Sequence, residues 1–181
     1  MDHTEMVALI RAGVAGQGGV WADLGAGTGN FTRALAELLG PGAMIHALDR
    51  DARAIAAQRA APTRGAAIVA RLADVTRDLG MPPLDGVLMA NLLHFIRDQA
   101  ELLARVRAAL KPGGRLLLVE YEQVTVIPWV PHPAPFARFA ELAEQAGFVA
   151  PVRVGWRRSP SSGRAMYAAL ALNPAPGPAP A

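Results

Sequence analysis

The stretch that decides the fold of this chain is VWADLGAGTGNF (Val20–Phe31). It begins as a short apolar run, passes an acidic residue and three closely spaced glycines, and ends where an amphipathic helix can begin. Glycine lets the backbone turn sharply and approach a ligand closely, and the free N–H groups of a helix start favour anionic or polar groups. The order of strand, glycine-rich turn and helix therefore predicts a ligand site at the end of a sheet strand.

The same alternation continues along the chain. Short apolar runs that are typical of strands covered on both faces lie at Val20–Leu24, Ala43–Leu48, Ala67–Ala73, Asp85–Ala90 and Arg115–Glu120. Stretches with helical spacing of apolar residues lie between them at Asn30–Leu39, Ala52–Ala60 and Asp98–Leu110. Alternating strands and helices predict an α/β fold with a mostly parallel sheet.

The texture of the sequence changes after Glu120. Val124–Phe136 contains four prolines and large apolar groups, which predicts an ordered loop that could act as a lid. A helix is expected over Ala137–Ala146, and the two runs Phe148–Trp156 and Ala165–Leu172 are typical of a terminal β-hairpin. Residues 1–172 are expected to form a single domain, and residues 173–181 a disordered Pro/Ala tail.

Composition bounds the function. The chain has 181 residues, no cysteine and a net charge of only +3, so disulfides, thiolate zinc sites and cysteine nucleophiles are excluded. The start of the sequence lacks the features of a signal peptide, and no apolar run approaches the ~20 residues of a membrane span. We expect a soluble, cytoplasmic protein with no membrane partner.

The acidic residues around the glycine turn separate two cofactor classes. Asp49 follows Gly29 by twenty residues, at the end of the second apolar run, where a carboxylate can accept hydrogen bonds from ribose hydroxyls. A dinucleotide site favours G-x-G-x-x-G, and here the third glycine comes one residue early. Asp23 would also repel a pyrophosphate, whereas it suits a cationic ligand such as S-adenosylmethionine. An NAD-dependent oxidoreductase is therefore disfavoured.

With these residues in view, the chain resembles the class I S-adenosylmethionine-dependent methyltransferases over residues 20–172. The segments that carry the likeness are DLGAGTG (Asp23–Gly29), ALDRD (Ala47–Asp51), LADV (Leu72–Val75), DGVLMANLLHFI (Asp85–Ile96) and LKPGGRLLLVEY (Leu110–Tyr121). The resemblance implies a Rossmann-like methyltransferase fold, a doubly wound, seven-stranded, mostly parallel sheet whose last strand is antiparallel. It also implies S-adenosylmethionine as cofactor and S-adenosylhomocysteine as product. LLHFI and KPGGRLLLVE resemble the branch that acts on small molecules, including the quinone-biosynthesis type.

The resemblance assigns roles to residues. Asp49 takes the ribose-binding place with Arg50 beside the adenine, Asp74 and the Val75 backbone meet the adenine edge, and Asn91 lies near the methionine end. The implied cofactor-binding set is Asp23, Gly25, Gly27, Gly29, Asp49, Arg50, Asp74, Val75 and Asn91. The candidate catalytic residues on the acceptor side are His94, Glu120 and Tyr121, with His132 a further candidate.

Structural roles compete with several of these assignments. Asp51 is expected to cap the helix that begins at Ala52, and Asp74 could serve as a turn residue before Thr76. His94 sits among apolar residues, where a histidine can be a satisfied core residue as easily as a base. Methyl transfer from a sulfonium also needs no base if orientation and desolvation suffice.

Several chemistries lack their residues. Without cysteine there is no cytosine-C5 mechanism of the usual kind. The lysine-dependent mechanism of ribose 2′-O-methyltransferases is also excluded, because the only lysine, Lys111, lies before the fifth strand, at the opposite edge from the strand ends where ligands bind. No metal site is predicted.

We expect a small, apolar or aromatic acceptor, and a homodimer is left open. The alternatives are an RNA or protein methyltransferase, suggested by the arginines after residue 150, and a non-catalytic S-adenosylmethionine-binding scaffold; nucleic-acid binding is disfavoured because no aromatic interleaving accompanies the arginines.

Overall fold

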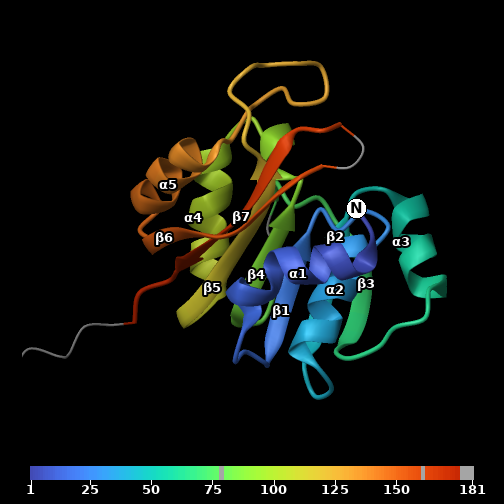
Figure 1. Cartoon of the computed structure of the whole chain (residues 1–181). Helices are drawn as coiled ribbons and strands as arrows, with labels where there is room; N and C mark the ends of the chain where they lie inside the picture. The colour runs from blue at the N-terminus through green and yellow to red at the C-terminus, as the bar shows by residue number, and fades with distance from the viewer. Residues whose placement is uncertain (78–79, 160–161, 176–181) are drawn as a thin grey trace, which may run out of the picture.

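The computed structural model describes residues 1–77, 80–159 and 162–175. Its centre is a seven-stranded sheet in the order β3-β2-β1-β4-β5-β7-β6 (Figure 1). The strands are β1 (Val20–Leu24), β2 (Met44–Asp49), β3 (Ala67–Leu72), β4 (Leu84–Ala90), β5 (Leu110–Tyr121), β6 (Val149–Arg158) and β7 (Ala165–Leu172). Strands β1 to β5 pair in parallel, and β7 is antiparallel to both of its neighbours. The predicted fold class, including the antiparallel last strand, is confirmed.

Helices cover both faces of the sheet. They are α1 (His3–Val14), α2 (Asn30–Leu39), α3 (Ala52–Ala60), the short 3-10 turn η1 (Leu93–Phe95), α4 (Gln99–Ala109) and α5 (Phe136–Gln145). Helices α1 and α2 share one core with the sheet, while α4 and α5 share a second core with its other face. The strand residues alternate between them: Trp21 and Ile45 face the first core, whereas Ala22 and Leu48 face the second. This two-sided burial explains why the strands are continuously apolar.

Helix α1 precedes β1 in a stretch for which no helix or strand was predicted. Asp2 caps α1 by accepting the Glu5 N–H at 2.8 Å, and the Glu5 side chain accepts the Asp2 N–H in return. This reciprocal pair is the capping-box signature, D-x-x-E, which is visible in the sequence. Helix α1 packs on α2 and on β6 and so covers the sheet where the hairpin joins it.

Two boundaries also move. Strand β5 begins at Leu110 rather than Arg115, because Leu84 pairs with Leu110 and Gly86 with Arg115, leaving the Lys-Pro-Gly-Gly segment as an irregularity within the strand. Asn173 holds this segment: its Nδ2 donates to the carbonyls of Leu110 at 2.9 Å and Lys111 at 3.1 Å. Asn173 is buried and the ordered chain passes the expected boundary at residue 172. Residues 176–181 of the expected tail, and 160–161 of the hairpin loop, lie outside the described residues.

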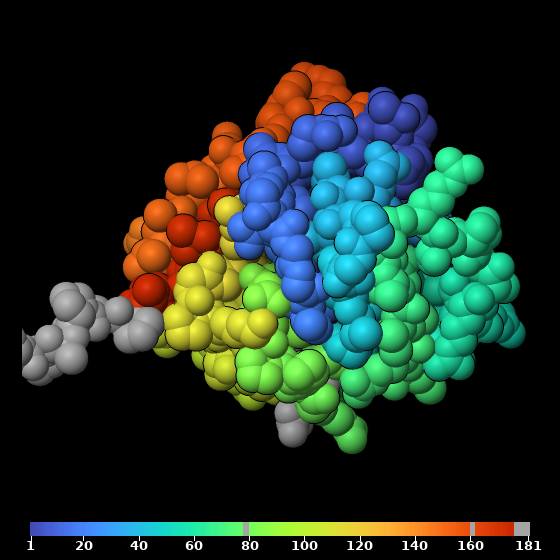
Figure 2. Space-filling model, turned by 90° about the horizontal axis from the view of Figure 1, so that it is seen from below, coloured from blue at the N-terminus to red at the C-terminus, as the bar shows by residue number. Residues whose placement is uncertain are grey.

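The beginnings of the parallel strands are joined by paired polar groups. The Asp85 carboxylate, at the start of β4, accepts the Val20 N–H at 2.7 Å and receives Lys111 Nζ at 2.8 and 2.9 Å. Lys111 therefore lies at the amino end of the sheet, as its position in the sequence predicts. Figure 2, seen from below, shows the segments around this end lying against one another: the start of β1 (blue), the segment that leads into β2 (cyan) and the start of β5 (yellow). None of the described helices is long and apolar enough to cross a membrane.

Candidate cofactor and acceptor site

The glycine-rich turn joins β1 to α2 in a backbone conformation that side chains disfavour. Gly25, Gly27 and Gly29 all have positive φ angles, of 70°, 53° and 83°. The turn is fastened to the neighbouring strand, since the N–H groups of Gly25 and Ala26 both donate to the Leu48 carbonyl, at 2.8 and 2.9 Å. A Cβ on Gly25 would lie 2.7 Å from the Leu92 side chain. The turn therefore approaches the segment after β4 as closely as a glycine allows.

Asp49 fixes this turn from the end of β2. Its two carboxylate oxygens accept the N–H groups of Gly27, at 2.7 Å, and Asp51, at 2.8 Å. Asp51 caps α3 by accepting the Arg53 N–H at 2.8 Å, which confirms the role expected for it. The sequence analysis missed Gln58, whose buried Nε2 donates to the Gly27 carbonyl at 2.7 Å. A helix-interior glutamine carries no sequence signal for such a contact.

A cavity of about 300 Å³ opens beside the carboxyl ends of β1, β2 and β4. Six of the nine predicted cofactor residues line it, namely Gly25, Asp49, Arg50, Asp74, Val75 and Asn91. The residues that line it but were not predicted are Ala73, Thr76, Leu92, Phe95, Ile96 and Arg97. Asp23, Gly27 and Gly29 are not in its lining. Four chain segments, those at the ends of β1, β2, β3 and β4, thus converge on one cavity, in the size range of small-molecule sites.

Asp74 is both a cavity residue and a turn residue. One of its oxygens accepts the N–H and the hydroxyl of Thr76, at 2.9 and 2.7 Å. These hydrogen bonds lower the pKa of Asp74, so the side chain is ionised at neutral pH. The turn role and the cofactor role therefore do not exclude one another, because Thr76 binds one oxygen and the other lies 3.7 Å from Arg77 Nε.

Asp23 differs from the other acidic residues because it is buried. Only 1% of it is exposed, one oxygen accepts the Thr32 hydroxyl at 2.6 Å, and the other has no hydrogen-bond partner within residues 1–77, 80–159 and 162–175. Burial raises the pKa of Asp23 from its ordinary value near 3.8 to about 7, and the Asp49 charge adds to the rise while Thr32 opposes it. Its position beneath the turn makes it a support of the site rather than part of the cavity wall.

Asn91 carries the second buried side-chain oxygen that has no hydrogen-bond partner among the described residues. It follows β4 with a φ of 55°, a left-handed conformation that asparagine tolerates better than most residues. Its N–H donates to the Val119 carbonyl at 2.8 Å. Asn91 lines the cavity, and its Oδ1 is the buried oxygen that no described residue pairs with. An unpaired amide oxygen beside a cavity is suited to a ligand's donor group.

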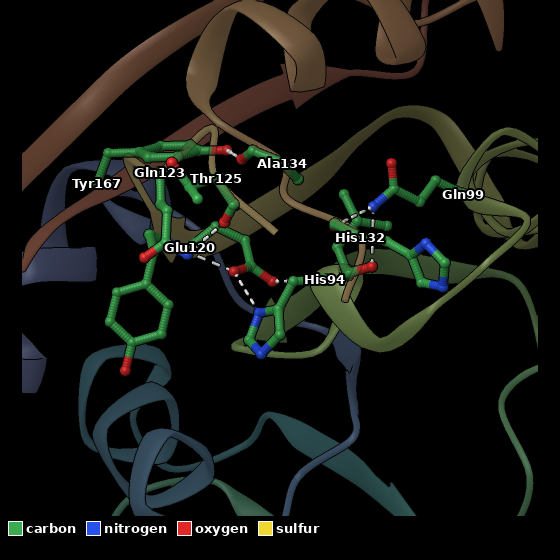
Figure 3. Close-up of polar contacts among 10 residues, drawn as sticks. His94, Gln99, Glu120, Gln123, Thr125, His132, Ala134 and Tyr167 are labelled. Carbon is green, nitrogen blue, oxygen red and sulfur yellow. Dashed lines mark hydrogen bonds and ion pairs between the residues drawn. The ribbon is translucent and has the colours of Figure 1, made fainter. Parts of the chain in front are cut away.

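The predicted acceptor-side residues meet in a buried pair. His94 Nδ1 lies 2.7 Å from Glu120 Oε2, and the His94 N–H donates to Glu120 Oε1 at 3.2 Å (Figure 3). The exposed fractions of the two side chains are 3% and 1%. The Tyr121 ring lies 5.9 Å from the His94 ring, and the Tyr121 N–H donates to Glu120 at 3.3 Å. The structure thus brings His94, Glu120 and Tyr121 together at the ends of β4 and β5.

The loop after β5 arches over the same end of the sheet (Figure 1). Its tip exposes Val124, Val126 and Trp129, whereas Val130 and Ala134 are buried. His132 does not join the histidine–glutamate pair through its ring; its N–H donates to the His94 carbonyl at 2.9 Å. The expectation of an ordered loop fits these contacts, and its action as a lid stays a prediction.

Two arginines of the terminal hairpin pair with acidic residues that are distant in the sequence. Arg153 pairs with Glu122 at 2.5 Å, and Arg157 pairs with Glu5 of α1. Arg153 also lies over the Phe136 ring, 4.7 Å from its centre. The lack of acidic residues near the hairpin in the sequence therefore does not leave these two arginines as free positive charges.

Comparisons with known proteins agree with this geometry. Residues 22–116, more than half of the chain, match the methyltransferase domain family. Acetylserotonin O-methyltransferase of Mus musculus is 38% identical over 109 residues, which span 56% of this chain and 28% of that protein. Trans-aconitate 2-methyltransferase of Mycolicibacterium gilvum is 35% identical over 92 residues, 51% of this chain and 34% of that protein. The chain thus spans about a third of these curated relatives.

Solved structures extend the likeness to almost the whole chain. A possible histamine N-methyltransferase of Thermotoga maritima has a TM-score of 0.71 at 16% identity, covering 94% of this chain and 89% of that one. Human N-acetylserotonin methyltransferase with S-adenosylmethionine has a TM-score of 0.69 at 19% identity, covering 96% and 52%. At these identities the structures show the shared fold. With the family match across the glycine turn, both aspartate motifs and the start of β5, the chain belongs to the methyltransferase domain family.

Proposed function

We propose that this protein binds S-adenosylmethionine in the cavity beside β1, β2 and β4 and transfers its methyl group to a small-molecule acceptor. The observation that carries the proposal is the convergence of Asp49, Asp74 and Asn91 on one cavity at the carboxyl ends of the strands. In open α/β sheets, ligands bind at this edge, where the strand order reverses. Family membership supplies the reaction class.

The cavity residues fit the parts of this cofactor. Each Asp49 oxygen already accepts one backbone N–H, and a carboxylate oxygen has a second lone pair with which to accept a ribose hydroxyl. Asp74 and Val75 line the cavity, and we infer that they contact the adenine, with the Asp74 carboxylate accepting a hydrogen bond from its amino group. The unpaired Asn91 oxygen and the Gly25 backbone are left for the methionine end.

The cofactor, when bound, supplies an electrophilic methyl group on a sulfonium. The chain's own part in the reaction is to hold the acceptor in line, exclude water and remove a proton where the acceptor carries one. Because the Glu120 carboxylate accepts a hydrogen bond from Nδ1, it holds the His94 proton on Nδ1 and leaves the lone pair of Nε2 to receive the acceptor proton. Glu120 also accepts the His94 N–H, which fixes the backbone that carries the ring.

The acceptor is proposed to be a small, largely apolar or aromatic molecule. Phe95 and Trp129, at 52% and 59% exposure, lie on the segments after β4 and β5 and offer aromatic surface on the acceptor side. The proteins that the chain resembles are named for acetylserotonin, trans-aconitate and, in Bordetella avium, ubiquinone and menaquinone biosynthesis. The neutralised arginines Arg153 and Arg157 weigh against a nucleic-acid acceptor.

The proposal is tested with S-adenosylmethionine that carries a labelled methyl group and a panel of phenols, carboxylic acids and quinols, with an RNA oligonucleotide as a control. We expect label in one of the small acceptors and none in the RNA. His94→Gln should slow transfer to an acceptor with an ionisable proton by ~10²–10³-fold, while S-adenosylhomocysteine affinity stays within threefold. Cofactor binding without transfer to any acceptor would instead support a non-catalytic scaffold.

A further inference from the structure

Gln99 is buried at a point where a glutamine would usually reach into water. It is the first residue of α4, and only 8% of it is exposed. Its Nε2 donates to the Leu93 carbonyl at 3.1 Å and to the His132 carbonyl at 2.9 Å (Figure 3). Both hydrogens of the side-chain amide are therefore used, one on the turn that carries His94 and one on the loop after β5.

A backbone hydrogen bond closes the same connection from the other side. The His132 N–H donates to the His94 carbonyl at 2.9 Å. The His94 turn and the loop stem are thus tied twice, once directly and once through Gln99. The two ties involve consecutive residues of the turn, Leu93 and His94, so together they restrict rotation as well as separation of the two segments.

The chemistry of this position admits few side chains. The Leu93 and His132 carbonyls need one side-chain group that donates two hydrogen bonds. The NH₂ of the glutamine amide is such a donor, at the end of a side chain of the right length. A glutamate in its place would bring a third acceptor against two carbonyls. A methionine has similar length and helix propensity but donates nothing.

The remaining anchors of the loop do not reach the His94 turn. Tyr167 Oη donates to the Ala134 carbonyl at 2.6 Å, and Glu122 accepts the Phe136 N–H at 3.2 Å while pairing with Arg153. These contacts fasten the loop stem to β7 and β6. Gln99 and the His132 N–H connect the stem to the pair formed by His94 and Glu120.

We propose that Gln99 is a positioning residue: it sets the orientation of the His94 imidazole relative to the loop that covers the acceptor. The inference rests on the proposed function, in which His94 receives a proton from an acceptor held under this loop. Gln99 is not one of the residues that line the cavity, and its amide donates to the Leu93 and His132 carbonyls, so we expect its effect on His94 to pass through these two carbonyls.

The first test uses the unaltered protein labelled with ¹⁵N and followed by NMR. Both side-chain amide protons of Gln99 and the His132 N–H should exchange with water slowly, and the His94 ring should appear as a single tautomer with its proton on Nδ1. Fast exchange of either Gln99 amide proton would contradict the double tie, and this result requires no variant to fold.

The second test compares Gln99→Met and Gln99→Glu with Ala100→Glu. Ala100 is exposed in the same first turn, so Ala100→Glu adds the same charge beside the same helix start, where an acidic residue is favourable. We expect exchange of the His132 N–H to be at least tenfold faster in both Gln99 variants, with a second set of His94 ring signals. His3 and His46 should be unchanged in all three variants, and Ala100→Glu should match the unaltered protein.

Titration with S-adenosylhomocysteine separates the two proposals. Affinity within threefold of the unaltered protein, together with altered His94 signals, supports a positioning role. Unchanged His94 and His132 signals in folded Gln99→Met overturn it while leaving the proposed function intact. Absence of S-adenosylhomocysteine binding in the unaltered protein overturns the proposed function, and the exchange data then report on the tie alone.

Discussion

The two ends of the parallel strands differ in how their aspartates are paired: Asp85 at the amino end is half-buried and fully paired, whereas Asp23 at the carboxyl end is buried and paired through one oxygen. At the amino end, Asp85 has a hydrogen bond from Val20 and two contacts from Lys111, and no oxygen is left without a partner. At the carboxyl end, one oxygen of Asp23 and the amide oxygen of Asn91 are buried and unpaired. Among the described residues, unpaired oxygens thus gather at the end that has the cavity. Of these two residues Asn91 lines the cavity and Asp23 does not, so the unpaired oxygen of Asn91 is the one suited to a ligand.

The pKa values of the two aspartates express the same contrast. Burial raises the pKa of Asp23 to about 7. Burial acts in the same direction on Asp85, but hydrogen bonds from Lys111 and Val20 and the Lys111 charge outweigh it and lower the pKa. Ionised Asp23 therefore costs stability, while ionised Asp85 contributes it.

The largest expected effect is the pH dependence due to Asp23. The folded protein holds the Asp23 proton up to about pH 7, whereas the unfolded chain loses it near 3.8. The stabilisation is complete below the lower value and is lost as pH rises towards 7. We expect the free energy of unfolding to fall by about 2–3 kcal/mol between pH 5 and pH 8 from this group. Asp23→Asn should flatten the curve in urea denaturation and be the more stable protein at pH 8.

The next effect separates backbone strain from ligand contact. Gly25→Ala places a Cβ 2.7 Å from the Leu92 side chain at a φ of 70°. We expect ~1–3 kcal/mol of destabilisation and S-adenosylhomocysteine affinity at least tenfold lower. Gly113→Ala is the matched control, because its φ of 76° is as unfavourable but nothing lies near its Cβ. Gly113→Ala should lose stability and keep its affinity for S-adenosylhomocysteine. Equal losses of affinity in both variants would contradict a specific role of Gly25 in the cofactor site.

The smallest effect belongs to the amino end. Asp85→Asn removes the charge paired with Lys111, whose side chain is 44% exposed, and keeps an acceptor for the Val20 N–H. We expect a loss of about 1 kcal/mol at pH 7, which diminishes only as the pH falls below 3.8 and through the lowered pKa of Asp85 in the unaltered protein. Affinity for S-adenosylhomocysteine should not change. A tenfold change in that affinity would show that the two ends are coupled.

Local patterns were enough to predict the strands, the central helices and the order of the motifs. The glycine turn, Asp49 and Asn91 all lie directly after apolar runs, and the carboxyl ends of parallel strands meet at one edge. Contacts between distant segments could not be predicted in this way. Three side-chain hydrogen bonds join residues that become neighbours only through the packing of helices and loops. They run from Gln58 to the Gly27 carbonyl, from Asn173 to the Leu110 carbonyl and from Gln99 to the His132 carbonyl.

The partners and the burial of charged residues could not be predicted from local patterns either. The sequence around Arg153 contains no partner, because Glu122 lies thirty-one residues earlier. Glu122 follows β5 and is brought near Arg153 of β6 because both strands pair with β7. Asp23 was correctly placed at the end of β1, but nothing in the sequence indicates that Thr32 and the turn cover it, leaving it outside the cavity lining.

The most direct measurement is calorimetric titration of S-adenosylhomocysteine into the unaltered protein, Asp49→Ala and Lys111→Met. Asp49→Ala removes the acceptor of the Gly27 and Asp51 N–H groups and the proposed ribose contact, whereas Lys111→Met changes only the amino end. We predict binding by the unaltered protein and Lys111→Met with equal affinity, and at least a hundredfold weaker binding by Asp49→Ala. Equal affinity in all three proteins, or no binding by the unaltered protein, would contradict a cofactor site at the carboxyl end of this sheet.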